Sequence, residues 1–267
     1  MKTFGFIGTG NMGGALARAT AKAVSPDCIF LSDSYAPVAE ALAKELGCCA
    51  ASVKEVAEKA DFVWLGVKPQ VMASVLSEIA PVLAARKNTP VLISMAAGVS
   101  MADICRMVGA EYPVIRIMPN MPVSVGGGMI LYDYTNTVSE DAVQAFTQSL
   151  SFAGLLDHLP EKLIDAGSAL SGCGPAFVCL FAEALADGAV ACGLPRDKAM
   201  RYASQTLMGT AKLLQETGRH PGQVKDAVCS PGGTTIAGVE ALEQGGFRAS
   251  TMDAVTRAYE RTLELGK

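Results

Sequence analysis

Two glycine-containing segments combine residue types that could bind anionic groups. The first has the spacing Gly-x-Gly-x-x-Gly and comprises Gly8, Thr9, Gly10, Asn11, Met12 and Gly13. Glycine permits a tight turn and the close approach of a pyrophosphate, and a following helix supplies amide donors and the positive end of its dipole. We interpret the segment as a dinucleotide-binding turn, because it follows an apolar run and precedes an Ala-rich one. The alternative is a tight turn with only a structural role.

An acidic residue stands where the ribose of a dinucleotide would be bound. Asp33 ends the second predicted strand, about 20 residues beyond Gly13, the usual distance for a carboxylate that binds ribose hydroxyls. Such a carboxylate repels a 2′-phosphate, and residues 29–39 contain no Lys or Arg that would attract one. Ser32 and Ser34 offer only weak donors to a phosphate. The local chemistry favours NADH, unless Asp33 is a solvated surface residue.

The second glycine-containing segment lies near the C-terminus and comprises Ser230, Gly232, Gly233, Thr234 and Thr235. Small residues before a helix leave backbone amides free to bind a carboxylate or a phosphate, and the hydroxyls add further donors. The alternative is an ordinary N-capped loop between two helices.

A lysine follows a buried strand at the sheet edge where ligands bind in open α/β proteins. Val67, Lys68 and Pro69 come directly after the apolar run of residues 61–67. Lys68 could therefore contact a cofactor phosphate or ribose. Alternatively it is a surface lysine before a helix that has Pro69 at its first position.

These segments are positioned by strands and helices that alternate along the first part of the chain. Apolar runs predict strands over residues 4–7, 28–32, 61–67, 90–95 and 114–118. Helices are expected between them, over residues 15–23, 35–46, 71–83 and 102–108. Continuous apolar strands that alternate with helices indicate a parallel sheet covered on both faces. We expect an α/β protein whose Rossmann-like dinucleotide-binding domain spans residues 1–160.

After about residue 160, Ala-rich helical segments replace the strands, and we expect an all-helical domain over residues 161–267. The segment 175–192 is apolar almost all round, interrupted mainly by Glu183 and Asp187. A helix of this kind must be enclosed on most sides. A second copy of the chain is the obvious cover, which predicts a homodimer.

Composition excludes several classes of protein. Lys and Arg total 22 against 26 Asp and Glu, with no basic run, so a nucleic-acid partner is not expected. The 8 cysteines form no Cys-x-x-Cys pair and there are only 2 histidines, so no metal site is expected. The longest uncharged runs, residues 117–132 and 166–182, are broken by Gly and Pro, which argues against a membrane span. Free thiols and a glycine-rich N-terminus indicate a cytoplasmic protein.

Taken together, the motifs resemble those of the pyrroline-5-carboxylate reductase family, from residue 4 to about residue 260. The matching segments are residues 6–13, 67–69, 96–98, 118–120, 169–176, 184–195, 220–223, 230–237 and 242–248. The resemblance implies a Rossmann-like domain, a helical dimerisation domain that interlocks with a second subunit, and possible assembly into a larger homo-oligomer. It also implies hydride transfer from NAD(P)H to the C=N carbon of 1-pyrroline-5-carboxylate, which gives L-proline in the last step of proline biosynthesis.

The resemblance also implies roles for individual residues. The amides of 232–235 with Ser230 would hold the substrate carboxylate, and the Thr235 hydroxyl would bond the ring nitrogen, so that Ser230 and Thr235 form the catalytic pair. The nicotinamide side would be lined by Val67, Lys68, Ala97 and Asn120. The family often uses NADPH whereas Asp33 favours NADH, so the expected cofactor is NADPH or NADH.

Two other functions are compatible with parts of the sequence. A 3-hydroxyacid dehydrogenase would place a catalytic Lys in the first interdomain helix, but residues 171–181 contain none. A dinucleotide sensor or a pyridoxal-binding regulator would have no substrate at residues 230–235. Synergy between proline and the cofactor in a thermal-shift measurement would distinguish an enzyme from such a sensor.

Overall fold

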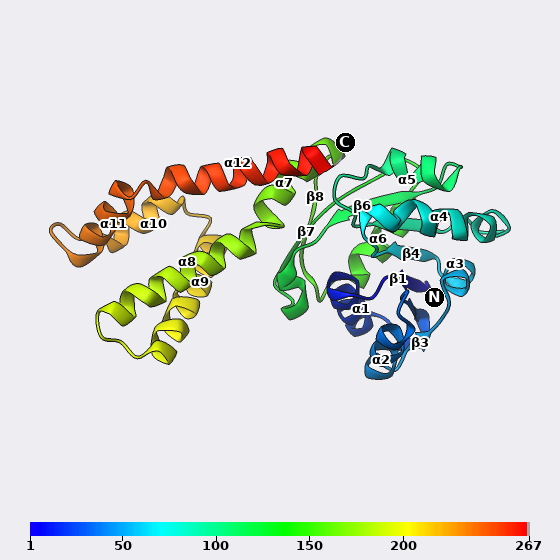
Figure 1. The fold of residues 1–267 in the computed structure, drawn as a ribbon, viewed down its shortest axis with the longest axis horizontal. Coiled ribbons are helices and arrows are strands. Elements are labelled where there is room, and N and C mark those ends of the chain that lie inside the picture. The colour runs from blue at the N-terminus through cyan, green and yellow to red at the C-terminus, as the bar shows by residue number, and fades with distance from the viewer. Residues whose placement is uncertain (266–267) are drawn as a thin grey trace. The chain divides into compact units, whose positions relative to one another are not determined.

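The computed structural model describes residues 1–265, and the chain divides into two compact units (Figure 1). The first unit comprises residues 1–173 and residues 258–265, and the second comprises Gly174–Arg257.

The first unit is built on an eight-stranded sheet with the order β3-β2-β1-β4-β5-β6-β7-β8. The strands are β1 (Phe4–Ile7), β2 (Ile29–Ser32), β3 (Cys49–Ala50), β4 (Phe62–Leu65), β5 (Val91–Ser94), β6 (Val114–Met118), β7 (Gly128–Tyr134) and β8 (Gly154–His158). The first six strands are mutually parallel in the doubly wound order 3-2-1-4-5-6. This confirms the α/β class with a Rossmann-like N-terminal domain.

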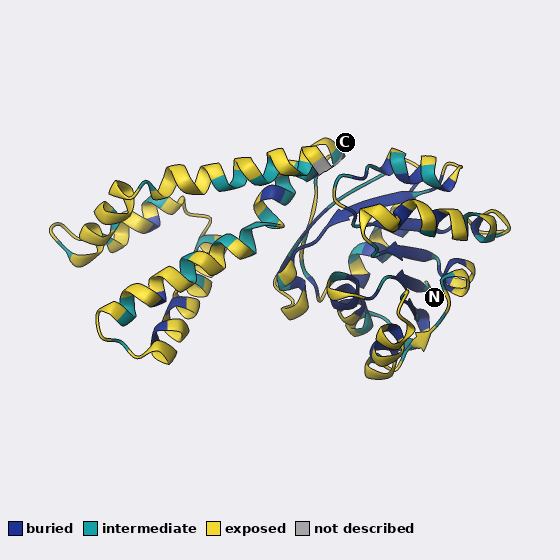
Figure 2. Ribbon diagram, viewed as in Figure 1, coloured by how far each residue is buried: buried dark blue, intermediate teal, exposed yellow. Residues whose placement is uncertain are grey.

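Helices cover both faces of this sheet. They are α1 (Asn11–Ala23), α2 (Ala36–Leu46), α3 (Val53–Lys59), α4 (Pro69–Ala84), α5 (Met101–Val108), α6 (Glu140–Ser149) and α7 (Glu161–Ser171), with short 3₁₀ turns η1 (Pro26–Cys28) and η2 (Met121–Val125). Strand β4 is apolar without interruption because both of its faces are buried. Phe62 and Trp64 pack into the core on one side of the sheet, and Val63 and Leu65 pack into the core on the other. Successive side chains of a strand point to opposite faces, so both sets are buried. Figure 2 shows these strands as buried.

The sheet differs from the sequence prediction at its far edge. Strand β7 runs antiparallel to β6, and β8 runs parallel to β7, so the sheet is mixed rather than purely parallel. The β7–β8 pair depends on two glycines, because a Cβ on Gly154, whose φ is +136°, would lie 2.1 Å from the carbonyl oxygen of Gly128. Strands β7 and β8 were not predicted from the sequence, nor were β3, α3, α6 or α7.

The division of the chain differs from the predicted boundary at residues 160 and 161. Residues 161–173 were assigned to the helical domain without a helix being predicted there, and α7, which they form, packs with the first unit. The physical reason is a small core in which Ile164, fully buried, contacts Met118 and Leu131 of the sheet.

The second unit consists of helices, as predicted: α8 (Gly174–Ala191), α9 (Arg196–Thr217), α10 (Pro221–Val228), α11 (Thr234–Gln244) and the first part of α12 (Phe247–Leu265). Its buried core is small, and in α8 and α9 it comprises Ala186, Ala199 and Ala203. Large apolar side chains of α8 remain exposed, among them Val178 at 53% and Leu180 at 67%. Figure 2 shows helices α8–α12 as largely exposed.

One helical stretch, Glu161–Ala191, is long and apolar enough to cross a membrane, judged by length and composition alone. The sequence analysis considered the run 166–182 too interrupted to form such a helix. In the structure α7 ends at Ser171 and α8 begins at Gly174, so the run is interrupted at Gly172. Pro175 lies in the first turn of α8, where no intrahelical donor is lost.

Candidate functional site

The predicted cofactor-binding residues are brought to one edge of the sheet. Strands β1, β2, β4, β5 and β6 are parallel, and their carboxyl ends are level because Ile7 pairs with Ser32 and Leu65, and Leu65 pairs with Ser94. The predicted residues lie at or just after these ends: Gly8, Thr9, Gly10, Asn11, Met12, Gly13, Ser32, Asp33, Ser34, Val67, Lys68, Pro69, Ala97 and Asn120. Ligands of open α/β sheets bind in the crevice outside this edge.

The three glycines of the first loop are not equivalent. A Cβ on Gly8, whose φ is +92°, would lie 2.5 Å from the carbonyl oxygen of Gly66, and a Cβ on Gly13 would lie 2.1 Å from that of Gly8. Those two glycines are required by the fold itself. Gly10 has no protein atom within 4 Å of its Cβ position, so packing does not explain it. A glycine that keeps space open beside a helix N-terminus fits the approach of a pyrophosphate.

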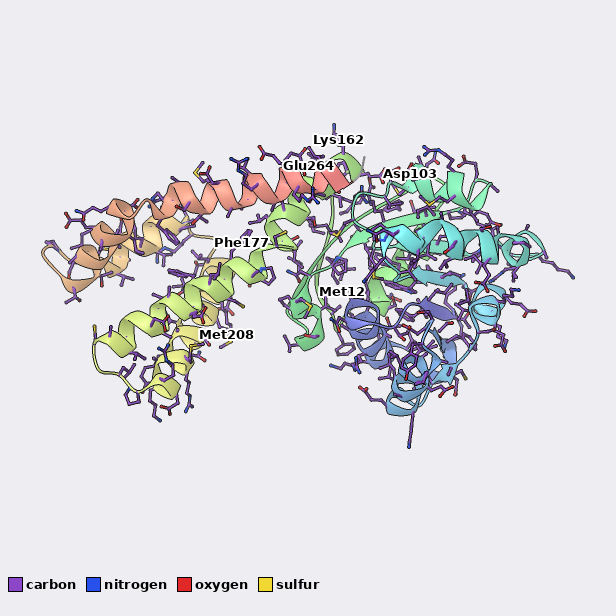
Figure 3. The ribbon with its side chains drawn as sticks, viewed as in Figure 1. Met12, Asp103, Lys162, Phe177, Met208 and Glu264 are labelled. Atoms are coloured by element: carbon purple, nitrogen blue, oxygen red, sulfur yellow. The ribbon has the colours of Figure 1, made fainter. Side chains whose placement is uncertain are left out.

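Helix α1 begins without the usual neutralising groups. Gly10 is its N-cap and makes no side-chain cap, and the first turn contains no acidic residue. The first backbone N–H groups of a helix have no intrahelical partner, so the start of α1 retains free donors and the positive end of the dipole. Met12, labelled in Figure 3, lies in this first turn. These features fit an anionic ligand.

The Asp33 side chain is hydrogen-bonded to the glycine loop. Its Oδ2 accepts hydrogen bonds from the Thr9 backbone N–H at 2.7 Å and from the Thr9 hydroxyl at 3.2 Å. Its Oδ1 accepts from the Tyr35 N–H at 3.1 Å and from the Ser34 hydroxyl at 3.4 Å. Burial raises the pKa of the Asp33 carboxyl, but the hydrogen bonds outweigh it, and the net pKa lies below its ordinary value. Asp33 is therefore a fixed negative charge at neutral pH.

The residues after β4 and β5 are more accessible. Lys68 is the N-cap of α4, with Pro69 at the first helical position, and its side chain is exposed. Ala97 is exposed in the turn that follows β5. Within the described residues 1–265, the Lys68 ammonium has no hydrogen-bond or salt-bridge partner. It is free to contact a ligand at this edge.

Asn120 has a structural role that the sequence did not reveal. It is 9% exposed, its Nδ2 donates to the carbonyl oxygen of Ser171 at 2.9 Å, and its Oδ1 accepts from the Met129 N–H at 2.9 Å. The side chain thus joins the end of β6 to the end of α7 and the start of β7. No local pattern indicates these partners, because Ser171 is 51 residues away.

A buried arginine on the same strand is a second feature that the analysis missed. Arg116 is 3% exposed, and its guanidinium lies 2.5 Å from Asp165 and 3.5 Å from Glu161. The two acids are four residues apart and so share one face of α7. A lone Arg in the apolar strand 114–118 requires buried partners, and that requirement could have pointed to this acidic pair.

The predicted substrate residues form a separate group in the second unit. Gly232 has a φ of +69° and Gly233 is the N-cap of α11, which has no side-chain cap and no acidic residue in its first turn. A Cβ on Gly233 would lie 2.3 Å from the Ser230 Oγ. A larger residue at position 233 would therefore displace the Ser230 hydroxyl. Across residues 1–265, the hydroxyls of Ser230, Thr234 and Thr235 have no intramolecular hydrogen-bond partner. The Gly233 N–H donates to the Ser230 carbonyl oxygen at 3.0 Å. The unpartnered hydroxyls and the remaining first-turn amides of α11 gather at this one helix start.

Comparison with known proteins shows to which family this chain belongs. A family model described as pyrroline-5-carboxylate reductase dimerisation matches residues 161–265, and one described as NADP oxidoreductase, coenzyme F420-dependent, matches residues 3–98. Pyrroline-5-carboxylate reductase 3 of Macaca fascicularis is 40% identical over 266 residues, which cover 98% of this chain and 96% of that protein. The chain belongs to the pyrroline-5-carboxylate reductase family. The resemblance stated from the sequence is thereby confirmed.

Further relatives support the assignment over the full length. The pyrroline-5-carboxylate reductase of Escherichia coli is 39% identical, covering 100% of this chain and 99% of that protein. The solved structure of a pyrroline-5-carboxylate reductase from Coxiella burnetii has a TM-score of 0.91 at 31% identity, with 100% of this chain and 99% of that chain covered. The pyrroline carboxylate reductase of Plasmodium falciparum, solved with NADP bound, has a TM-score of 0.87 at 31% identity and covers 100% of this chain and 98% of that chain. The expected activity, reduction of 1-pyrroline-5-carboxylate to L-proline with NADPH or NADH, is confirmed.

Proposed function

We propose that residues 230–235 bind the carboxylate of 1-pyrroline-5-carboxylate. The observation that carries this proposal is the start of α11, where backbone amides lack a side-chain cap and hydroxyls lack intramolecular partners. Such a start has the donors and the dipole that suit a carboxylate. Ser230, Gly232 and Thr234 provide the donors around that carboxylate. Gly233, whose N–H donates to the Ser230 carbonyl oxygen, shapes the turn that presents them. The residue that follows, Thr235, is placed to reach the ring.

In this proposal, the hydroxyl of Thr235 forms a hydrogen bond with the ring nitrogen, and Ser230 holds the substrate carboxylate in position. A protonated C=N bond is already a good hydride acceptor, so the enzyme needs no strong acid beside the reacting carbon. Its task is to position two ligands and to exclude water. The scarcity of histidine in the chain is consistent with this reaction.

The cofactor is held by the first unit. When bound, the reduced nicotinamide supplies the hydride. The loop 8–13 and the uncapped start of α1 hold the pyrophosphate, and Ser32, Asp33 and Ser34 face the adenosine ribose. The nicotinamide side is bordered by Val67, Lys68, Pro69, Ala97 and Asn120. The position of Gly10, open where packing demands no glycine, supports this assignment.

We also propose that the chain acts as a homodimer, and as a larger homo-oligomer where dimers associate, in the cytoplasm. Helix α8 exposes apolar side chains, and an apolar groove of about 540 Å³ lies between α8, α11 and α12. Phe177, labelled in Figure 3, lines this groove, and the rings of Phe181 and Phe247 meet in it with centroids 5.4 Å apart. A second copy of the chain would cover this surface without requiring a membrane. On this basis residues 1–160 bind the cofactor, and residues 161–267 dimerise and bind substrate.

The assignment of residues 230–235 is tested by Thr235→Ala and Ser230→Ala, with Thr210→Ala as the matched control. Thr210 is an exposed residue of α9 outside the proposed site. Loss of a hydrogen bond to a charged substrate costs about 10- to 100-fold in kcat/KM for 1-pyrroline-5-carboxylate. The control is expected to keep its activity. Equal activity in all three variants would remove residues 230–235 from the substrate site.

A further inference from the structure

We infer that this chain uses NADH in preference to NADPH, and that Asp33 is the residue that sets the preference. The inference rests on the proposed function, because it takes the edge around β2 as the site of the adenosine ribose. It goes further by choosing between two cofactors that differ only in one phosphate group.

The first step is the position and rigidity of the Asp33 carboxylate. Thr9 donates to Oδ2 through both its N–H and its hydroxyl, and Tyr35 donates its N–H to Oδ1. An ionised carboxylate has about four lone-pair sites, and Thr9 fills the two on Oδ2. On Oδ1 the bond from the Ser34 hydroxyl is long, at 3.4 Å, so a ribose hydroxyl can take its place. Because Thr9 belongs to the glycine loop, the carboxylate lies next to the segment that would hold the pyrophosphate. It is therefore placed for the ribose diol and is not free to swing away from a 2′-phosphate.

The second step is the charge of the space beside Asp33. A pocket of about 500 Å³ is lined by Ser32 and Asp33 and by three further acids, Glu40, Glu55 and Glu78, with no Lys or Arg in its wall. Lys59 lies 3.4 Å from Glu55 and balances that acid. Within the described residues 1–265, Glu40 and Glu78 have no salt-bridge partner. The pocket thus presents an excess of negative charge to any group entering it.

Arg18 is an arginine that lies near the glycine loop of residues 8–13. Arg18 lines a neighbouring pocket of about 420 Å³ together with Thr9 and Tyr35. NADP sites usually place an arginine against the 2′-phosphate. Here Arg18 Nε and Nη2 donate to the two carboxylate oxygens of Glu45, each at 2.7 Å. This two-point pair neutralises the charge of Arg18 and engages two of its five N–H donors, so a phosphate would have to compete with Glu45 for the guanidinium.

A 2′-phosphate would therefore meet a fixed carboxylate, and the walls of the two pockets beside it hold no cation other than the paired Arg18. A ribose hydroxyl would meet an acceptor in Asp33 Oδ1. Like charges at contact distance in a partly solvated site correspond to a discrimination on the order of 10- to 100-fold. We expect the ratio of kcat/KM for NADH to that for NADPH to lie in this range, with the difference appearing mainly in KM.

The experiment compares the wild-type protein with Asp33→Asn, Asp33→Ser and a control, Asp27→Asn. Asparagine keeps a carbonyl oxygen for the Thr9 N–H while removing the charge, so Asp33→Asn remains informative if Asp33→Ser folds poorly. Asp27 is an exposed acid at the opposite end of β2, so its substitution removes the same charge without touching the site. The kcat/KM values for both cofactors and the dissociation constants of NAD⁺ and NADP⁺ are measured for each protein.

We expect the wild type and Asp27→Asn to favour NADH and to bind NAD⁺ more tightly than NADP⁺. In both Asp33 variants the ratio should fall at least 10-fold, through tighter binding of NADP⁺. A wild type that favours NADPH, or an unchanged ratio in Asp33→Asn, would overturn the inference. If neither cofactor supports turnover while the dissociation constants follow the expected pattern, the inference on Asp33 stands and the proposed function fails.

Discussion

The side-chain amide of Asn120 donates to the carbonyl oxygen of Ser171 at 2.9 Å while it accepts from the Met129 N–H at the same distance. One side chain thereby connects the ends of β6 and α7 with the start of β7. Ser171 is the last residue of α7, three positions before the second unit begins. Asn120, which is proposed to border the nicotinamide, therefore also holds the C-terminal end of α7 against the sheet of the first unit.

Substitution of Asn120 should reduce both stability and activity. Asn120→Ala removes both hydrogen bonds, and Asn120→Asp keeps the acceptor for Met129 but leaves the Ser171 carbonyl without its donor. Each buried group left unsatisfied costs about 1–3 kcal/mol, so we expect a loss of that size in urea denaturation. Asn136→Ala, in an exposed turn, is the control and should match the wild type. Wild-type stability in both Asn120 variants would show that these bonds contribute nothing.

The buried Arg116 should be essential for holding α7 on the sheet. Arg116→Met leaves Asp165 and Glu161 without their cation, and breaking a buried ion pair costs about 3–5 kcal/mol. The double variant Arg116→Met with Asp165→Asn removes one of the stranded charges and should recover part of the loss. Chemical denaturation of the three proteins measures this. A double variant less stable than Arg116→Met would contradict the account.

Asp103 provides a pH-dependent contribution that is separate from the site. Figure 3 labels this residue on α5, where it accepts bonds from the Ser100 hydroxyl at 2.6 Å and from the Ser100 N–H at 3.1 Å. The Ser100 hydroxyl, despite the opposing effect of burial, lowers the pKa of Asp103, and the Ser100 N–H and Arg106 lower it further.

The folded pKa of Asp103 thus lies below its unfolded value of about 3.9, so its stabilisation is present above that pH and is lost as pH falls through the folded pKa. Asp103→Asn should destabilise the protein at neutral pH, and the difference from wild type should shrink as the pH approaches 3. Melting temperatures across this range test the prediction. A difference that grows on acidification would contradict it.

The exposed face of α8 should mediate self-association. Leu180→Glu places a charge on the apolar face, where a partner would bury it at high cost. We expect monomers in sedimentation velocity, whereas Val38→Glu, on α2 of the first unit, should leave the oligomer intact. If Leu180→Glu sediments like the wild type, this face is not the interface.

Strands that are buried on both faces could be predicted from the sequence, because such burial requires a continuous run of apolar residues. Strand β6 was predicted over residues 114–118 with its observed bounds, and β4 to within two residues at its C-terminal end and one at its N-terminal end. By contrast, β7 was not predicted: residues 129–132 form only a short apolar run, which glycines precede and Asp133 interrupts. The strand pairs antiparallel with β6. Its direction follows from tertiary pairing, which local patterns do not encode.

Part of the candidate site was equally accessible to prediction. The loop 8–13 and residues 230–235 were recognisable because glycine and hydroxyl residues precede helices there. The contact between Asp33 and Thr9 follows from the parallel pairing of β1 and β2 and could be anticipated in outline. The bond from Asn120 to Ser171 could not, because it joins segments about 50 residues apart through packing of the whole unit. For Arg116 the sequence indicates only that acidic partners are needed, and the packing of α7 determines which acids they are.

The most direct test of the account is turnover of 1-pyrroline-5-carboxylate by the purified protein. Loss of absorbance of the reduced nicotinamide is followed with NADH and with NADPH, and L-proline is quantified in the same reactions. We predict oxidation that depends on the substrate and yields one L-proline for each reduced cofactor consumed. No turnover with either cofactor, by protein shown to be folded and oligomeric, would contradict the central claim.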